Sequence, residues 1–213
     1  MTLAFRLGSI PVRIHGSFFL TTLLLAAGRM NQPKLLLLWA LIVLGSVLLH
    51  ELGHAVAGRL FGLAPEIDLH AMGGTTSWTW GRGVSDGKSI VISLAGPAVG
   101  LVLAGVILAG LMFGGFQPET PLAHQALADL VIVNGYWGLV NLLPVLPLDG
   151  GNVTRSVLRL LTRGGGEKAT RWVSFVVAVL LTLGFLVSRN WFAALLFGMF
   201  AVQNFRGLRE AGI

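Results

Sequence analysis

Two histidines and a glutamate lie in the sequence His-Glu-Leu-Gly-His at residues 50–54, inside the almost wholly apolar, proline-free run 35–58. If this run is helical, His50 and His54 project from one face, one turn apart, where a single metal ion can accept both imidazoles. Glu51 lies roughly 100° around the helix axis, which suits a base acting on water better than a third ligand. The spacing therefore predicts a metal site with a general base beside it.

The composition indicates an integral membrane protein. Hydrophobic residues make up 54% of the 213 residues and charged residues only 11%, and the mean hydropathy is +0.80. Ionisable side chains at bilayer depth are costly and mark functional sites. The net charge of +6 does not indicate a nucleic-acid partner, because the basic residues are scattered between apolar runs. The chain has no cysteine, so imidazole and carboxylate groups must hold any metal.

The apolar runs predict an all-α polytopic membrane protein with about six transmembrane helices. The runs cover residues 16–28, 35–58, 89–116, 130–148, 172–187 and 190–205. The first run is short and also fits the apolar part of a secretory signal, so its retention as a full span is left open. The last two runs fit a hairpin around Arg189. We expect a single intramembrane domain over 1–213, with a core at 35–151 and helices 5 and 6 at 172–205.

The basic residues predict the orientation of the chain. With six spans, Arg29, Lys34 and Arg189 fall in loops on one side of the membrane, and the other Lys and Arg residues fall on the opposite side. The positive-inside rule then places both termini in the cytosol and the active site toward the cytosolic side.

One stretch between the second and third runs has β character. Residues 66–71 alternate polar and apolar, and residues 75–80 are rich in β-branched and aromatic types. Gly73 and Gly74 between them predict a two-residue turn. The stretch therefore predicts a small membrane-associated β-hairpin.

A third metal ligand is needed beside the two histidines, and Asp149 is the best candidate. It ends the fourth apolar run, where Pro144 and Pro147 interrupt a helix and free backbone groups that only protein or a water-filled cavity can accommodate. The alternative is a turn aspartate, since Asp-Gly is common in turns. Asn141 can offer its side-chain amide to an oxyanion or to substrate backbone.

These motifs together resemble the site-2 proteases, a family of intramembrane zinc metalloproteases. The resemblance rests on residues 50–54, the 141–150 stretch, the hairpin glycines and Ala-Gly-Pro at 95–97. It implies one Zn²⁺ per chain, and it corresponds to a minimal form without PDZ or CBS domain. Gly100 departs from the asparagine that the family often has there. The implied ligands are His50, His54 and Asp149, with Glu51 as general base and Asn141 as a substrate contact.

The expected function is hydrolysis of a peptide bond in or near the transmembrane segment of a membrane-tethered protein. The expected partners are a single-span membrane protein and the lipid bilayer. The hairpin, including Gly73 and Gly74, can bind an unwound substrate as an added strand. The main alternative is a zinc transporter or non-catalytic metal-binding membrane protein, but that function requires polar residues along several spans.

Overall fold

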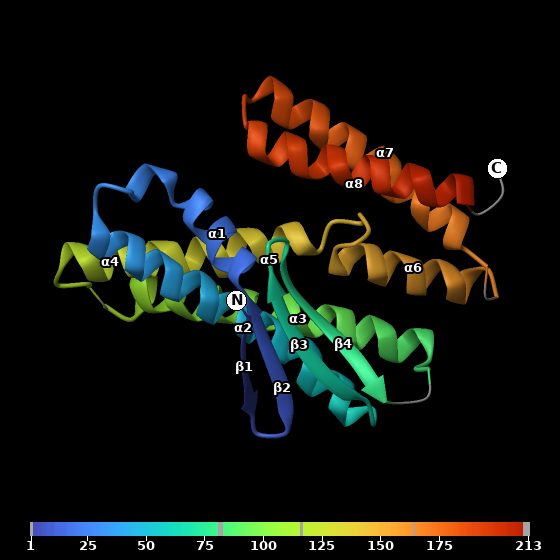
Figure 1. The fold of residues 1–213 in the computed structure, drawn as a ribbon, viewed down its shortest axis with the longest axis horizontal. Coiled ribbons are helices and arrows are strands. Elements are labelled where there is room, and N and C mark those ends of the chain that lie inside the picture. The colour runs from blue at the N-terminus through green and yellow to red at the C-terminus, as the bar shows by residue number, and fades with distance from the viewer. Residues whose placement is uncertain (1, 81–82, 116, 164, 211–213) are drawn as a thin grey trace. The chain divides into compact units, whose positions relative to one another are not determined.

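The computed structural model describes residues 2–80, 83–115, 117–163 and 165–210, and it contains a small sheet among many helices (Figure 1). The elements are β1 (Thr2–Leu7), β2 (Ile10–His15), α1 (Gly16–Leu25), η1 (Ala27–Arg29), α2 (Pro33–Leu60), β3 (Ala64–His70), β4 (Gly73–Trp80), α3 (Asp86–Phe113), α4 (Pro121–Val131), the π-helix η2 (Ile132–Tyr136), α5 (Trp137–Asn141), α6 (Asp149–Leu161), α7 (Glu167–Val187) and α8 (Trp191–Glu210). The chain divides into two compact units, which are described separately. The first comprises residues 1–83 and 95–140, and the second comprises residues 84–94 and 141–213.

The first unit contains a four-stranded sheet in the order β1-β2-β3-β4. β1 pairs antiparallel with β2, and β3 with β4, whereas β2 and β3 are parallel. α1 and α2 form the long crossover connection that a parallel pair requires. The sequence predicted only the β3–β4 hairpin. The missed signal lies in β2, where Ile10, Val12 and Ile14 are buried and alternate with more exposed residues.

The predicted hairpin is confirmed, but its predicted turn is wrong. His70 pairs with Gly73, so Ala71 and Met72 form the two-residue turn, and Gly73 and Gly74 begin β4. Gly73 has a φ of +112°, a backbone conformation that side-chain-bearing residues rarely adopt. Glycine at position 73 is therefore explained by the backbone conformation at the start of β4.

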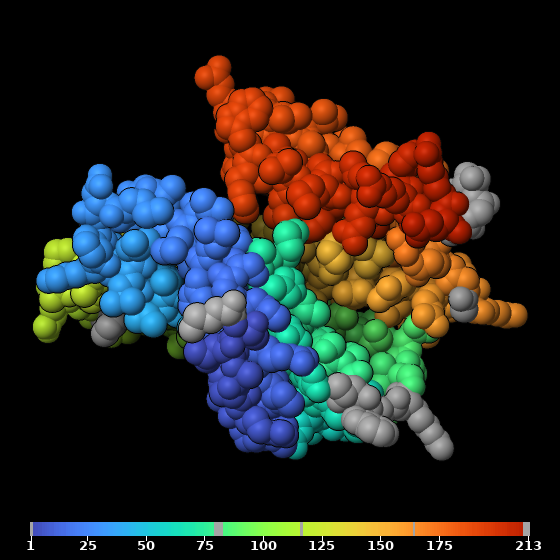
Figure 2. Space-filling model, in the orientation of Figure 1, coloured from blue at the N-terminus to red at the C-terminus, as the bar shows by residue number. Residues whose placement is uncertain are grey.

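One face of the sheet packs against α2. Val12, Ile67 and Leu69 are 0% exposed and belong to one core cluster with Ala55 of α2. The opposite face is polar, and Figure 2 shows its strands uncovered on the viewed side. There Arg13 bonds to both Glu66 and Asp68. The sheet thus covers the part of α2 that carries residues 50–54 and presents charges outward.

The predicted apolar runs correspond to helices of unequal length. Among the described residues, α2, α3 and α7 are long and apolar enough to cross a membrane. α1 has only 10 residues. The fourth run is helical only to Asn141, and the segment that follows is not helical. α7 and α8 lie side by side as the expected hairpin (Figure 1). The count of six spans stays a prediction.

A buried ion pair that the sequence reasoning missed joins α4 to the connection between α1 and α2. The Asp129 carboxylate is fully buried and accepts hydrogen bonds from Arg29 Nη1 at 2.5 Å and Nη2 at 2.7 Å. Gln125 Nε2 donates to the same carboxylate, and the Arg29 guanidinium lies 4.7 Å from the Trp39 ring centroid. The hydrogen bonds to Asp129 raise the pKa of Arg29, against the opposing effect of its partial burial.

We predict that Asp129→Asn destabilises the protein by about 3 kcal/mol, because it leaves the Arg29 charge without its buried partner. The matched control is Asp86→Asn. Asp86 pairs with Arg159 at 3.4 Å, and both side chains are more exposed, so its loss is expected to cost about 0–1 kcal/mol. Thermal unfolding of the purified variants in detergent measures both effects. Equal shifts in midpoint would contradict a special role for the buried pair.

Candidate metal centre

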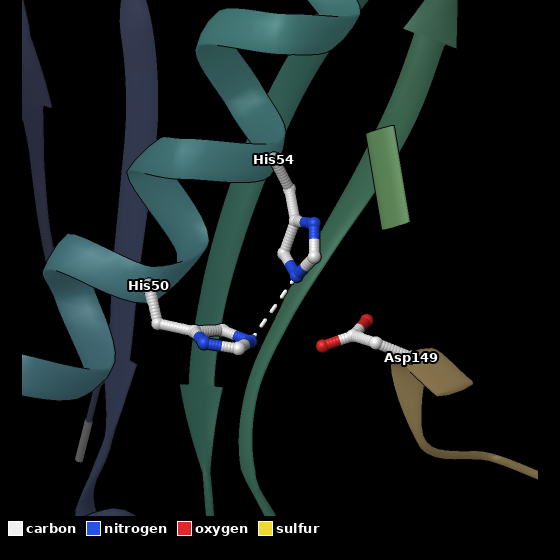
Figure 3. Close-up of side chains that lie close together, drawn as sticks. All are labelled: His50, His54 and Asp149. Carbon is white, nitrogen blue, oxygen red and sulfur yellow. Dashed lines mark hydrogen bonds between the residues drawn. The ribbon is translucent and has the colours of Figure 1, made fainter. Parts of the chain in front are cut away.

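The two histidines of residues 50–54 face each other on α2, as their spacing predicted. Their Nε2 atoms lie 3.1 Å apart (Figure 3). Two imidazole nitrogens bound to one tetrahedral ion at 2.0–2.1 Å are separated by about 3.3 Å, so this geometry fits a shared metal. His54 is 7% exposed and His50 is partly buried. The two imidazoles of α2 are therefore close enough to bind one ion together.

Two glycines let α2 and α3 pack closely beside the imidazoles. Gly53 faces the backbone of α3, where an added Cβ would lie 2.7 Å from the Ala95 carbonyl oxygen. Gly96 faces the His54 ring, and an added Cβ there would overlap the ring. Pro97, immediately after Gly96, is fully buried. The Ala-Gly-Pro sequence at 95–97 thus allows α3 to pack directly against the metal-binding face of α2.

Glu51 points to the sheet. It is 5% exposed, and its Oε2 atom accepts a hydrogen bond of 2.7 Å from Thr76 Oγ1 of β4. The same hydroxyl lies 3.1 Å from the Glu51 carbonyl oxygen. A Cβ at Gly74 would lie 2.5 Å from both Cγ and Oε1 of Glu51. Gly74 therefore makes room for the Glu51 carboxylate, a role that the sequence alone did not indicate. Substrate binding by Gly73 and Gly74 stays a prediction.

Asn141 and Asp149 lie in the second unit. Asn141 is the last residue of α5 and is partly buried. Asp149 is the first residue of α6, in the helical turn that follows the non-helical segment 142–148. The substrate role of Asn141 and the ligand role of Asp149 stay predictions.

A buried polar contact fixes α2 one turn before His50. Asn134 Nδ2 donates to Ser46 Oγ at 2.8 Å and to the Leu130 carbonyl oxygen at 2.9 Å. An added Cβ at Gly100 would lie 3.2 Å from the Asn134 carbonyl oxygen. Gly100, the departure from the family pattern, thus lets α3 approach the π-helix η2 closely. A polar residue within an apolar run was the available signal for Asn134.

The fold and the site together define a polytopic membrane protein with a paired-histidine centre on an apolar helix. The family model described as peptidase family M50 matches residues 120–184. A solved structure of a site-2 protease from Methanocaldococcus jannaschii has the same fold, with a TM-score of 0.67, 22% identity and coverage of 98% of this chain and 95% of that one.

Curated relatives are named as zinc metalloproteases. A Synechocystis protein provisionally named so is 34% identical over 79% of this chain and 46% of its own length. A zinc metalloprotease of Methanocaldococcus jannaschii is 28% identical over 87% of this chain and 54% of its own length. The chain spans about half the length of these relatives. The chain is thus similar to peptidase family M50 over residues 120–184, to relatives named as zinc metalloproteases, and in its fold to a site-2 protease.

We predict that Gly96→Ala weakens metal binding tenfold or more, because the new methyl group must displace the His54 imidazole. The control is Gly105→Ala on the same helix, where an added Cβ meets nothing within 4 Å. Both substitutions raise helix propensity, so a loss confined to Gly96→Ala cannot arise from a weaker helix. Competition of the purified proteins with a chromophoric chelator gives the affinities. Identical affinities for the parent and both variants would refute the steric role.

Proposed function

We propose that the protein is an intramembrane zinc metalloprotease that hydrolyses a peptide bond in or near the transmembrane segment of a membrane-tethered substrate. The observation that carries the proposal is the arrangement of residues 50–54. Two Nε2 atoms 3.1 Å apart fit one ion, and a buried carboxylate held by Thr76 lies next to them in sequence on the same helix. The match of residues 120–184 to the M50 family model and the relatives named as zinc metalloproteases support it.

In this proposal, His50, His54 and Asp149 hold the ion. Zinc, when bound, supplies a Lewis acid that polarises the scissile carbonyl and makes nearby water more acidic. Imidazole and carboxylate ligands suit zinc, and three protein ligands leave one position open for chemistry.

Glu51 acts as the general base and then as the general acid. It removes a proton from the attacking water, whose oxygen bonds to the scissile carbonyl carbon. It then delivers a proton to the leaving nitrogen as the carbon–nitrogen bond breaks. The Thr76 hydroxyl orients the carboxylate throughout. Asn141 is the proposed donor to the developing oxyanion or to the substrate backbone.

The substrate is proposed to be a single-span membrane protein whose helix unwinds and adds to the edge of β4. Helical amides are bonded internally, so an extended strand is needed to expose the scissile bond. β4 is the terminal strand in the described sheet, and it also carries Thr76. A strand added there gains backbone hydrogen bonds beside the proposed base. The distribution of basic residues supports cytosolic termini and a site opening toward the cytosol.

We predict that Glu51→Gln abolishes cleavage and retains zinc. The substitution keeps the shape of the side chain and an acceptor for Thr76, but it removes the base, so we expect a loss of at least about 10²-fold in kcat. Cleavage of a labelled single-span membrane protein and zinc content per chain are the measurements. Glu66→Gln is the matched control, because Glu66 lies on the outer face of the sheet and pairs with Arg13. Equal cleavage by parent and Glu51→Gln would sink the assignment.

The absence of cysteine makes the substrate strand testable by disulfide crosslinking. With Glu51→Gln to prevent turnover, we predict that Ser77→Cys in β4 crosslinks to a single cysteine placed near the cleavage site of the substrate. Ala4→Cys in β1, the other edge strand, is the control and should not crosslink. Both positions are exposed. Crosslinking from β1 alone, or equally from both strands, would argue against strand addition at β4.

A further inference from the structure

Leu146, three residues before Asp149, is held by side chains from both helices of the C-terminal hairpin. Its backbone N–H donates to Ser174 Oγ of α7 at 3.0 Å, and its carbonyl oxygen accepts from Asn204 Nδ2 of α8 at 2.8 Å. Ser174 is 0% exposed, Asn204 is 1% exposed and Leu146 is 9% exposed. Both backbone polar groups of Leu146 are therefore hydrogen-bonded to buried side chains.

The segment 142–148 needs such partners because it is not helical. Backbone groups outside a helix are tolerated at membrane depth only when protein or a water-filled cavity satisfies them. A serine and an asparagine buried in the apolar parts of α7 and α8 would be costly without partners of their own. The Ser174 hydroxyl and the Asn204 side-chain amide nitrogen each find a partner in the Leu146 backbone, and that amide nitrogen also donates to the Phe200 carbonyl oxygen.

The first turn of α6 packs tightly onto the same segment. A Cβ at Gly151 would lie 2.5 Å from the Leu146 nitrogen, and a Cβ at Gly150 would overlap the carbonyl groups of Leu142 and Leu143. The Leu148 N–H also donates to the Val145 carbonyl oxygen at 2.8 Å. Asp149 thus connects the segment 142–148, which α7 and α8 hold, to the first turn of α6, which packs against that segment.

We propose that Ser174 and Asn204 are positioning residues for Asp149. They hold Leu146, and through it they fix the place from which the Asp149 carboxylate reaches the metal. The C-terminal helix pair then serves the metal centre without contributing a ligand from either residue. This inference rests on the proposed function, in particular on Asp149 as a zinc ligand.

The test measures zinc affinity of the full chain in detergent by competition with a chelator. Ser174→Ala and Asn204→Leu are each expected to weaken zinc binding about 10- to 100-fold. The double variant should lose less than the product of the two effects, because both side chains hold the same residue. If Asn204→Leu does not accumulate, Ser174→Ala still tests the inference, because it removes only a single oxygen atom.

The control is Thr170→Val, one turn earlier on α7. Thr170 is also 0% exposed, but its hydroxyl donates to the Gly166 carbonyl oxygen and not to Leu146. Its zinc affinity should equal that of the parent. The melting temperature of each metal-free variant separates a general loss of stability from a loss of metal affinity.

Asp149→Ala separates failure of this inference from failure of the proposed function. If Asp149→Ala loses zinc while Ser174→Ala and Asn204→Leu bind as tightly as the parent, the positioning role is overturned and the proposed ligand stands. If Asp149→Ala binds zinc as the parent does, the ligand role falls and the positioning role falls with it. Weakened binding in all three variants, with Thr170→Val unaffected, supports the inference.

Discussion

The structure depends on burying ionisable side chains in an apolar helix without leaving them unsatisfied. Glu51 is 5% exposed and His54 is 7% exposed, and a charged or polar group so placed requires nearby polar partners. Thr76 reaches Glu51 from β4, and the His50 imidazole faces that of His54. The packing of the sheet and α3 around this part of α2 therefore depends on the polar contacts that Glu51, His50 and His54 need.

Small residues matter as much as polar ones in meeting that requirement. Gly74 admits the Glu51 carboxylate, Gly96 admits the His54 ring, and Gly53 lets α2 and α3 approach to backbone contact. Glycine often allows close packing of helices within a membrane, where no hydrophobic effect drives the helices together. Here this close packing also sets the shape of the metal centre.

The same balance recurs away from the histidines. In the first unit, Asp129 is fully buried and its carboxylate is matched by Arg29 and Gln125. In the second unit, the non-helical backbone at Leu146 is matched by Ser174 and Asn204. A transport pathway would require polar groups open to a permeating ion. The carboxylate of Asp129 is instead paired with an arginine, which suits a structural role.

The sequence by itself determined the helix that carries His50, Glu51 and His54 and the shared face of the two histidines. The spacing of His50 and His54 follows from the 3.6-residue period, and the apolar composition required a membrane setting, because both are local properties of the chain. Only the tertiary structure decided the partners, since these depend on residues far apart in sequence. Thr76 lies 25 residues from Glu51, and Asn204 lies 58 residues from Leu146. The β1–β2 strands and the turn at Ala71 and Met72 likewise depended on strand pairing, which sets a register that alternation alone leaves open.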